Sequence, residues 1–275
     1  MQLFRLIKSA FSTGDYYIAM NESLRKIDGN YTMLHYPLDG EDMSTFSQAQ
    51  KNLTDYCILK LPELSDKEVL EIGCGNGVQS MYIYEKYAPG FFTGVDLNHG
   101  NIMIANELTG DIPGNNIKFI VDDAQNLSTV KDNSVDIVIN IESAFHYPDK
   151  SAFIREVHRV LKPGGHFLIA DILTKSEKKK GPLSHWKRRM QFNHWPLFKY
   201  VENINLIGLN LLLSEDITHS IIEGYKKYRN WISDLKEAQF IKRFILRIFF
   251  RTNVILNVRL LKNRHNYHIF HGMKS

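Results

Sequence analysis

Between Val69 and Ile172, short apolar runs alternate with amphipathic stretches, and the connections between them are short and polar. The apolar runs predict strands at residues 69–72, 91–95, 117–121, 135–141 and 166–172. The amphipathic stretches predict helices at 78–87, 101–108 and 151–161, with a closing turn at 162–165. Strands that alternate with helices are typical of a parallel sheet covered on both faces, so we expect a doubly wound α/β fold.

The N-terminal part of the chain does not follow this alternation. Residues 1–30 have the amphipathic pattern of a helix that packs on a core or lies on a membrane, and packing is the commoner outcome. Residues 31–40 are aromatic and rich in turn formers, which predicts a loop that covers another part of the molecule. A helix follows, capped by Ser44 or Thr45 and ending at about Leu59.

The pattern changes again after Asp171, where a run of lysines leads into a stretch that mixes tryptophan and phenylalanine with bases. This stretch predicts an inserted cap at 176–200. The elements expected after it are a helix ending near 208, a strand at 209–213, helices at 217–235 and 239–250, and a last strand at 268–271. The complete prediction is a mostly parallel, seven-stranded sheet with N-terminal helices and the cap. We divide the chain into a covering segment at 1–60, a cofactor-binding core at 61–175, the cap at 176–200 and a C-terminal part at 201–275.

Three glycines on alternate positions, Gly73, Gly75 and Gly77, follow the first strand, Val69–Ile72. Such a strand and loop indicate a backbone that turns sharply and comes close to a ligand. No glycine follows at Val78, Gln79 or Ser80, as the dinucleotide fingerprint would require for a pyrophosphate. The loop therefore favours a nucleoside without phosphates over NAD or FAD.

Polar residues follow the other strands at the point where each ends. They are Asp96, Asp122 with Asp123, Asn140 with Glu142, and Asp171. Because ligands of open parallel sheets bind outside the carboxyl ends of the strands, we expect these residues to share one crevice. Asp96 suits two ribose hydroxyls or a helix cap before Asn98, and the sequence leaves open whether Asp122 or Asp123 points inward.

Five motifs in this order resemble the class I S-adenosylmethionine-dependent methyltransferases, which have a Rossmann-like fold. They are Val69–Gly77, Val95-Asp96, Asp123-Ala124, Ser134–Ile141 and Leu161–Gly165, and the resemblance covers about residues 45–175. It implies an enzyme whose cofactor is S-adenosylmethionine. The cofactor-binding residues that we derive from the loop, the strand ends and the resemblance are Glu71, Gly73, Gly75, Asn76, Gly77, Asp96, Leu97, Asp123, Ala124 and Asn140.

The segment Glu142–Asp149 is similar to the small-molecule methyltransferases of natural-product pathways, which include the rebeccamycin sugar O-methyltransferase, and more distantly to the sterol and tocopherol C-methyltransferases. Where those O-methyltransferases use a histidine base and an aspartate, this chain has His146 and Asp171. A histidine is suited to remove the proton of a hydroxyl at neutral pH. The alternatives are that His146 caps a turn and that Asp171 is a plain strand-end acid.

Four further histidines, at 35, 185, 194 and 219, also fall in segments expected near the crevice, and the sequence does not rank them as bases. Methyl transfer from a sulfonium needs no metal, and no Cys/His cluster or phosphate-binding lysine motif is present in the sequence. No serine lies in a nucleophile elbow, so hydrolase chemistry is not supported.

The composition of the chain indicates its class and its cellular compartment. The chain has 275 residues with 44% hydrophobic and 23% charged residues, as ordinary globular proteins do. Only two cysteines are present, Cys57 and Cys74, and no apolar run approaches the length of a membrane span. We therefore expect a reduced, cytoplasmic protein, either a monomer or a homodimer.

The net charge of +4 is unevenly spread, because the last forty residues are strongly basic. Apolar and basic residues alternate at helical spacing through 239–251, which predicts either core packing or peripheral contact with a membrane. Core packing is the commoner meaning of such a stripe. Nucleic acid is not expected, since the segment Asn140–Ser143 lacks the pattern of base methyltransferases.

These observations favour methyl transfer to a hydroxyl of an apolar or aromatic small molecule, with histidine assistance. C-methylation of a lipid, prenyl or sterol-like substrate is the alternative reaction. A non-catalytic cofactor-binding or scaffold protein is the alternative of a different class.

Overall fold

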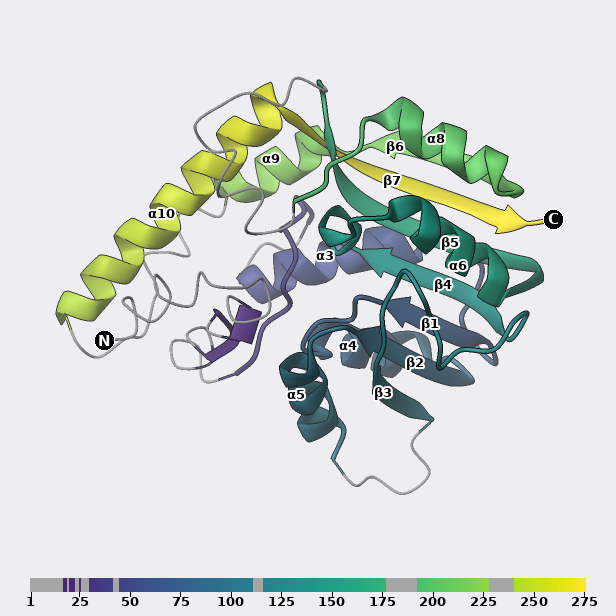
Figure 1. The fold of residues 1–275 in the computed structure, drawn as a ribbon. Coiled ribbons are helices and arrows are strands. Elements are labelled where there is room, and N and C mark those ends of the chain that lie inside the picture. Colours follow the sequence, from purple (N-terminus) through teal and green to yellow (C-terminus); the bar gives the residue numbers. More distant parts are fainter. Residues whose placement is uncertain are drawn as a thin grey trace.

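The structure, a computed structural model, describes residues 17–18, 20–22, 25, 30–41, 45–110, 116–176, 192–227 and 240–275. Its centre is a seven-stranded sheet in the order β3-β2-β1-β4-β5-β7-β6 (Figure 1). The strands are β1 Glu68–Ile72, β2 Phe91–Asp96, β3 Ile117–Val121, β4 Val135–Ile141, β5 Leu161–Thr174, β6 Leu209–Asp216 and β7 His265–Lys274. Only β7 runs antiparallel to its neighbours. The expected doubly wound, mostly parallel sheet of seven strands is confirmed.

Helices cover both faces of the sheet (Figure 1). They are α3 Phe46–Ile58, α4 Val78–Tyr87, α5 His99–Thr109, α6 Lys150–Val160, α8 Leu197–Leu206, α9 Thr218–Lys227 and α10 Phe240–Asn263, with a 3-10 turn η1 at Ala144–His146. Along β5, Leu168 and Ala170 pack with α3, α4 and α9 on one face, whereas Phe167 and Ile169 pack with α6 and α8 on the other. This alternation explains why the strand reads as an uninterrupted apolar run in the sequence.

The turn predicted at residues 162–165 is wrong, because these residues lie inside strand β5. Leu161 pairs with Val135, and the next pair along is Ile137 with His166. The intervening residues bulge out of the ladder, and Gly164 takes a left-handed φ of 76° there. The glycines that indicated a turn therefore serve a bulge within a strand.

The predicted ends of several other elements also need correction. Helix α10 extends to Asn263, well beyond the predicted end at 250, because no glycine or proline interrupts it.

Thr45 caps α3, accepting a hydrogen bond from the Gln48 amide at 3.1 Å. The first sixteen residues and residues 177–191 of the predicted cap lie outside the described residues.

The sequence pattern favoured core packing for the basic helix α10, but the structure exposes part of this helix. The side chains of Phe244 and Ile248 are 58% and 51% exposed, respectively. Across the described residues, no helix is long and apolar enough to span a membrane. Both cysteines are free and buried.

Candidate functional site

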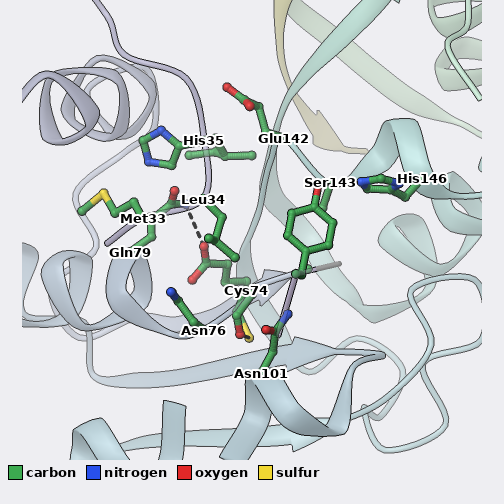
Figure 2. A pocket seen from close by; sticks show the side chains of 15 residues that line it. Met33, Leu34, His35, Cys74, Asn76, Gln79, Asn101, Glu142, Ser143 and His146 are labelled. Carbon is green, nitrogen blue, oxygen red and sulfur yellow. Dashed lines mark hydrogen bonds between the residues drawn. The ribbon is translucent and has the colours of Figure 1, made fainter. Parts of the chain in front are cut away.

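A cavity lies where β1 and β4 end, between the glycine loop and the segment that follows β4 (Figure 2). The space between its atoms, including the open mouth, is about 540 Å³. Its lining residues are Tyr17, Met33, Leu34, His35, Glu71, Gly73, Cys74, Gly75, Asn76, Gln79, Asn101, Ile141, Glu142, Ser143 and His146. The predicted crevice is therefore present, and predicted site residues from β1, the glycine loop and η1 meet in it.

The glycine loop holds its shape through left-handed backbone and close packing. Gly73 has a φ of 74°, and a Cβ there would collide with the hydroxyl of Ser143. Gly77 has a φ of 78°, and its Cβ would lie 2.6 Å from the Cβ of Ala105 on α5. Gly77 thus serves the packing of α4 on α5, whereas Gly73 and Gly75 line the cavity.

Glu71 comes from the middle of buried strand β1 and is 2% exposed. Its carboxylate accepts a hydrogen bond from Gln79 Nε2 at 2.7 Å and another from the Ser80 hydroxyl. Burial raises its pKa to about 7, although the two hydrogen bonds act in the opposite direction. A carboxyl group in this state gains stabilisation when a cation binds beside it.

Asp96, at the end of β2, is bonded to the glycine loop. One carboxylate oxygen accepts the Gly75 amide at 3.0 Å, and the other accepts the Asn98 amide at 2.8 Å. Burial raises its pKa. Asp96 therefore supports the start of α5, and it does not itself line the cavity.

The acids after β3 separate into two environments. Asp122 is buried and accepts hydrogen bonds from the Asp123 and Thr129 amides, both at 2.9 Å, so it is the acid that holds the turn. Asp123 accepts the Gln125 amide at 2.9 Å and is partly exposed. Beside it Ala124 is buried. Leu97 is 69% exposed, and the predicted cofactor-binding residues Leu97, Asp123 and Ala124 lie outside the lining of the cavity.

Asn140 holds the end of β1, where the glycine loop begins, and does not line the cavity. Its Nδ2 donates to the Ile72 carbonyl at 2.8 Å and to the Ser143 hydroxyl at 2.6 Å. Its Oδ1 is buried and finds no partner among the described residues. Asn140 therefore joins the ends of β1 and β4, and its role in the site is structural in this geometry.

A strap, which we define as residues 30–41, lies over the cavity. Figure 2 shows its Met33, Leu34 and His35 on the side of the cavity away from His146. Gln50 Nε2 of α3 donates to the Met33 carbonyl at 2.8 Å and to the His35 carbonyl at 2.7 Å. The sequence predicted a covering loop here and named only His35 in it, as one of four histidines that it could not rank as bases.

His35 is excluded as a base by its own contacts. Its Nδ1 lies 3.0 Å from the Tyr36 carbonyl, and its Nε2 lies 3.2 Å from the Thr54 hydroxyl. Burial lowers its pKa to about 4. Of the other histidines, His219 is exposed, His194 bonds the Ile172 carbonyl, and His185 lies outside the described residues.

Glu142 follows β4 in a left-handed backbone conformation with a φ of 52°, which is uncommon for a residue with a side chain. Its carboxylate accepts the Tyr36 amide of the strap at 2.7 Å. Burial raises its pKa to about 8. Glu142 thus brings a second buried carboxyl group to the cavity and connects β4 with the strap.

His146 ends η1 and lines the cavity. Its Nε2 lies 2.9 Å from the hydroxyl oxygen of Tyr17, and the two rings meet edge to face at 87°. The ring of His146 also packs on Phe145 and Phe192, with centroids 4.2 and 5.3 Å away. Sequence reasoning missed Tyr17, because nothing local links a tyrosine near the N-terminus to a histidine 129 residues later.

Asp171 makes its side-chain contacts elsewhere. It is fully buried, accepts a hydrogen bond from the Tyr200 hydroxyl, and lies 3.8 Å from Lys150 Nζ. Burial raises its pKa, while Lys150 lowers it. The Tyr200 hydroxyl and the backbone N–H groups of Ile172 and Phe145 also lower it. Asp171 therefore belongs to a buried polar cluster between β5, α6 and α8, and it contacts the backbone of Phe145, the neighbour of His146.

The cavity suits a cofactor that carries a positive sulfur and an amino group and has no phosphate. Among the described residues that line it, none is a lysine or arginine, and two are buried carboxyl groups, Glu71 and Glu142. Phosphate sites commonly include lysine or arginine beside backbone N–H groups, whereas a sulfonium is stabilised by carboxylates. The residues present thus fit S-adenosylmethionine.

Comparison with known proteins agrees with this fit. A family model described as a methyltransferase domain matches residues 63–236. A phthiotriol/phenolphthiotriol dimycocerosates methyltransferase of Mycobacterium ulcerans is 39% identical over 115 residues, which is 42% of this chain and 41% of that protein. A fatty-acid O-methyltransferase of Mycolicibacterium smegmatis is 39% identical over 109 residues, covering 40% of this chain and 38% of that protein. The chain thus matches about two fifths of the length of these relatives.

Among solved structures, the geranyl diphosphate C-methyltransferase of Streptomyces coelicolor A3(2) is similar in fold. Its TM-score is 0.73 at 15% identity, covering 96% of each chain, and it was solved with Mg²⁺, geranyl diphosphate and S-adenosyl-L-homocysteine. The family match covers more than half of the chain and includes β1, the glycine loop and the acids that follow the strands. The chain therefore belongs to the methyltransferase-domain family, as a class I enzyme whose cofactor is S-adenosylmethionine.

Proposed function

We propose that this enzyme methylates a hydroxyl group of an apolar, lipid-like small molecule, and that His146 and Tyr17 together remove the hydroxyl proton. The observation that carries this proposal is the hydrogen bond between Tyr17 and His146 at the wall of the cavity. Phenol and imidazole are both groups that can pass a proton at neutral pH.

For the cofactor, we assign Gly73, Gly75 and Asn76 to the backbone cradle and Asp96 to the ribose hydroxyls. The position of the Asp96 carboxylate beside the glycine loop, where both of its oxygens accept hydrogen bonds, supports this assignment. Glu71 and Glu142 supply negative charge near the methionine part, which is cationic. When bound, S-adenosylmethionine supplies a methyl group on a positively charged sulfur. Asp96 does not line the cavity but is bonded to Gly75, which does. The predicted cofactor contacts through Gly77, Leu97, Asp123, Ala124 and Asn140 have less support, since none of these residues lines the cavity either.

Proton removal by the Tyr17–His146 pair requires the neutral form of the His146 imidazole, whose unprotonated nitrogen can accept a proton. In this step the Tyr17 hydroxyl donates to Nε2, and the phenol oxygen accepts the proton of the acceptor hydroxyl. The acceptor oxygen gives its proton to Tyr17 as Tyr17 gives its own to Nε2, and the imidazole ends protonated. A positioned base of this kind contributes about 10²–10⁴-fold to a rate. Asp171 stays a candidate for an indirect role, because its described side-chain contacts are with Tyr200 and Lys150.

An apolar acceptor is supported by the surroundings of His146. Aromatic rings continue from it through Phe145 and Phe192 to His194, with neighbouring centroids 4.2 to 5.7 Å apart. Such a wall suits hydrocarbon better than a polar metabolite. The matched relatives are named for phthiotriol dimycocerosates and fatty acids, which are lipids.

C-methylation is the second candidate, and Glu142 is the observation that favours it. Addition of a methyl group to a carbon–carbon double bond leaves positive charge on the acceptor, which a buried carboxylate stabilises. The position of the methyl group in the product separates the two reactions.

The test uses methyl-labelled S-adenosylmethionine with a long-chain alkylphenol, a long-chain vicinal diol and a prenyl alcohol as acceptors. We expect an ether product, and we expect His146→Ala to lower kcat at least about 100-fold while cofactor affinity in calorimetry stays unchanged. Tyr17→Phe should lower kcat as well, without a matching rise in KM. The exposed His219→Ala serves as the matched control. Full turnover by His146→Ala contradicts the base assignment, and a label found on carbon selects the second candidate.

A further inference from the structure

Helix α10 carries an exposed face that the site does not use. The 24 residues from Phe240 to Asn263 include six lysines or arginines and no acid. Phe244, Ile248 and Ile255 are 58%, 51% and 61% exposed, respectively. Large apolar side chains this exposed, on a helix this basic, indicate an interaction surface.

The exposed residues fall on one stripe of the helix. Ile248 follows Phe244 by four residues and Ile255 follows Ile248 by seven, which keeps all three on the same side. Arg251, also exposed, lies on this stripe between Ile248 and Ile255. Arg259 and Lys262, both exposed, continue it toward the C-terminal end. The face therefore interleaves apolar groups with positive charge.

The opposite side of the helix is fixed to the body of the protein. Leu261 is 1% exposed and belongs to the core, and Val254 and Val258 pack against the same core. Asn257 Nδ2 donates to the hydroxyl of Tyr225 on α9 at 3.3 Å. Figure 1 shows α10 continuing from these contacts away from the sheet. Because the inner side is anchored, the stripe keeps facing outward.

We propose that α10 docks this stripe on an anionic lipid surface. Charge complementarity selects this partner, since a helix with six bases and no acid is attracted to anionic headgroups. The apolar side chains would enter the boundary between headgroups and acyl chains, as in helices that lie on membranes. A second copy of this chain fits less well, because the bases would face each other in the shared interface and charged residues are depleted from interface cores.

The anchored side of α10 is connected to the strap through α9. The ring of Tyr225, which Asn257 contacts, lies 5.2 Å from the ring of Tyr36 on the strap. The amide of Tyr36 is in turn bonded to Glu142 at the cavity. A chain of described contacts thus leads from α10 to the cavity, which suits an enzyme whose acceptor resides in a lipid layer. The docking proposal itself does not depend on the proposed reaction.

The experiment is flotation of the full chain with vesicles of phosphatidylglycerol, compared with vesicles of phosphatidylcholine alone. We expect binding to the anionic vesicles that weakens as salt rises from about 0.05 to about 0.5 M. The double variant Arg251→Gln/Arg259→Gln should bind about 30-fold more weakly. The triple variant Phe244→Ser/Ile248→Ser/Ile255→Ser should lose at least about tenfold at unchanged charge.

Matched controls replace similar residues outside the stripe. Leu206 on α8 is 78% exposed, and Arg155 on α6 is exposed as well, so Leu206→Ser and Arg155→Gln should bind vesicles as the wild type does. Circular dichroism of each variant shows that the fold is retained. No binding to anionic vesicles, or equal losses in the controls, overturns the proposal. Self-association that the triple variant abolishes, without vesicle binding, assigns the stripe to a second copy instead.

Discussion

Cofactor affinity should rise steeply with pH between about pH 6 and about pH 7. In the protein without cofactor, burial raises the pKa of Glu71 to about 7 and that of Glu142 to about 8. A sulfonium and an ammonium beside these groups favour their ionised forms. Binding must therefore drive protons off them, and a higher pH makes this step easier. The sign is a gain of affinity as pH rises, because the ionised carboxylates attract the cationic cofactor.

The size of the effect follows from the two pKa values. With a pKa of about 8, the ionised fraction of Glu142 grows about ninefold from pH 6 to pH 7. With a pKa of about 7, that of Glu71 grows about fivefold. Affinity should thus increase about 50-fold if both groups are ionised in the complex, and about 1.4 protons should leave per cofactor bound at pH 7.

Isothermal titration calorimetry in buffers with different ionisation enthalpies measures both quantities. Glu142→Gln should reduce the affinity change to about fivefold, the share of Glu71. S-adenosylhomocysteine, which lacks the positive sulfur, should show a shallower pH dependence than S-adenosylmethionine. Equal affinity at pH 6 and pH 7 with no proton release would refute the reasoning, because the two carboxyl groups would then not sense the cofactor charge.

Two further variants test other parts of the site. Asp96→Ala should weaken S-adenosylmethionine binding at least about tenfold in calorimetry, because a carboxylate hydrogen bond contributes about 1.5–3 kcal/mol; unchanged affinity would remove Asp96 from the cofactor contacts. Lys150→Met should lower the free energy of unfolding by about 3–5 kcal/mol in urea, since it leaves Asp171 charged and unpaired in the core. A stable Lys150→Met protein with a changed pH–rate profile would instead assign the cluster to proton transfer.

Most of the fold could be predicted from the chain because its signals are local. Apolar runs predict β1 to β5, and helical periodicity predicts α6. The bulge at 162–165 was mistaken for a turn because glycine serves both structures, and only the pairing of β4 with β5 distinguishes them. The end of α10 was missed because it depends on packing against the core through residues such as Leu261.

The site was predictable only where a motif follows a strand. Glu71, Gly73 and His146 were named from sequence and do line the cavity. Tyr17 and the strap reach it from the N-terminal part of the chain through contacts that span more than a hundred residues, such as that between Tyr36 and Glu142. No local pattern records such a contact. Asp171 was named from resemblance, which gives its place at a strand end but not the Tyr200 that bonds it.

The net charge of +4 combines a cavity that carries carboxyl groups with a helix that carries bases. The separation of these two regions of opposite charge is the clearest indication of function in the molecule. The cavity gathers buried carboxyl groups with no lysine or arginine among its described lining residues, whereas α10 has six bases and no acid. A cofactor that is a cation is drawn to the first surface, and an anionic lipid layer to the second. Were the same charges mixed, each surface would lose attraction for its own partner. The positions of the charges, more than their total, therefore distinguish the cofactor pocket from the basic helix α10.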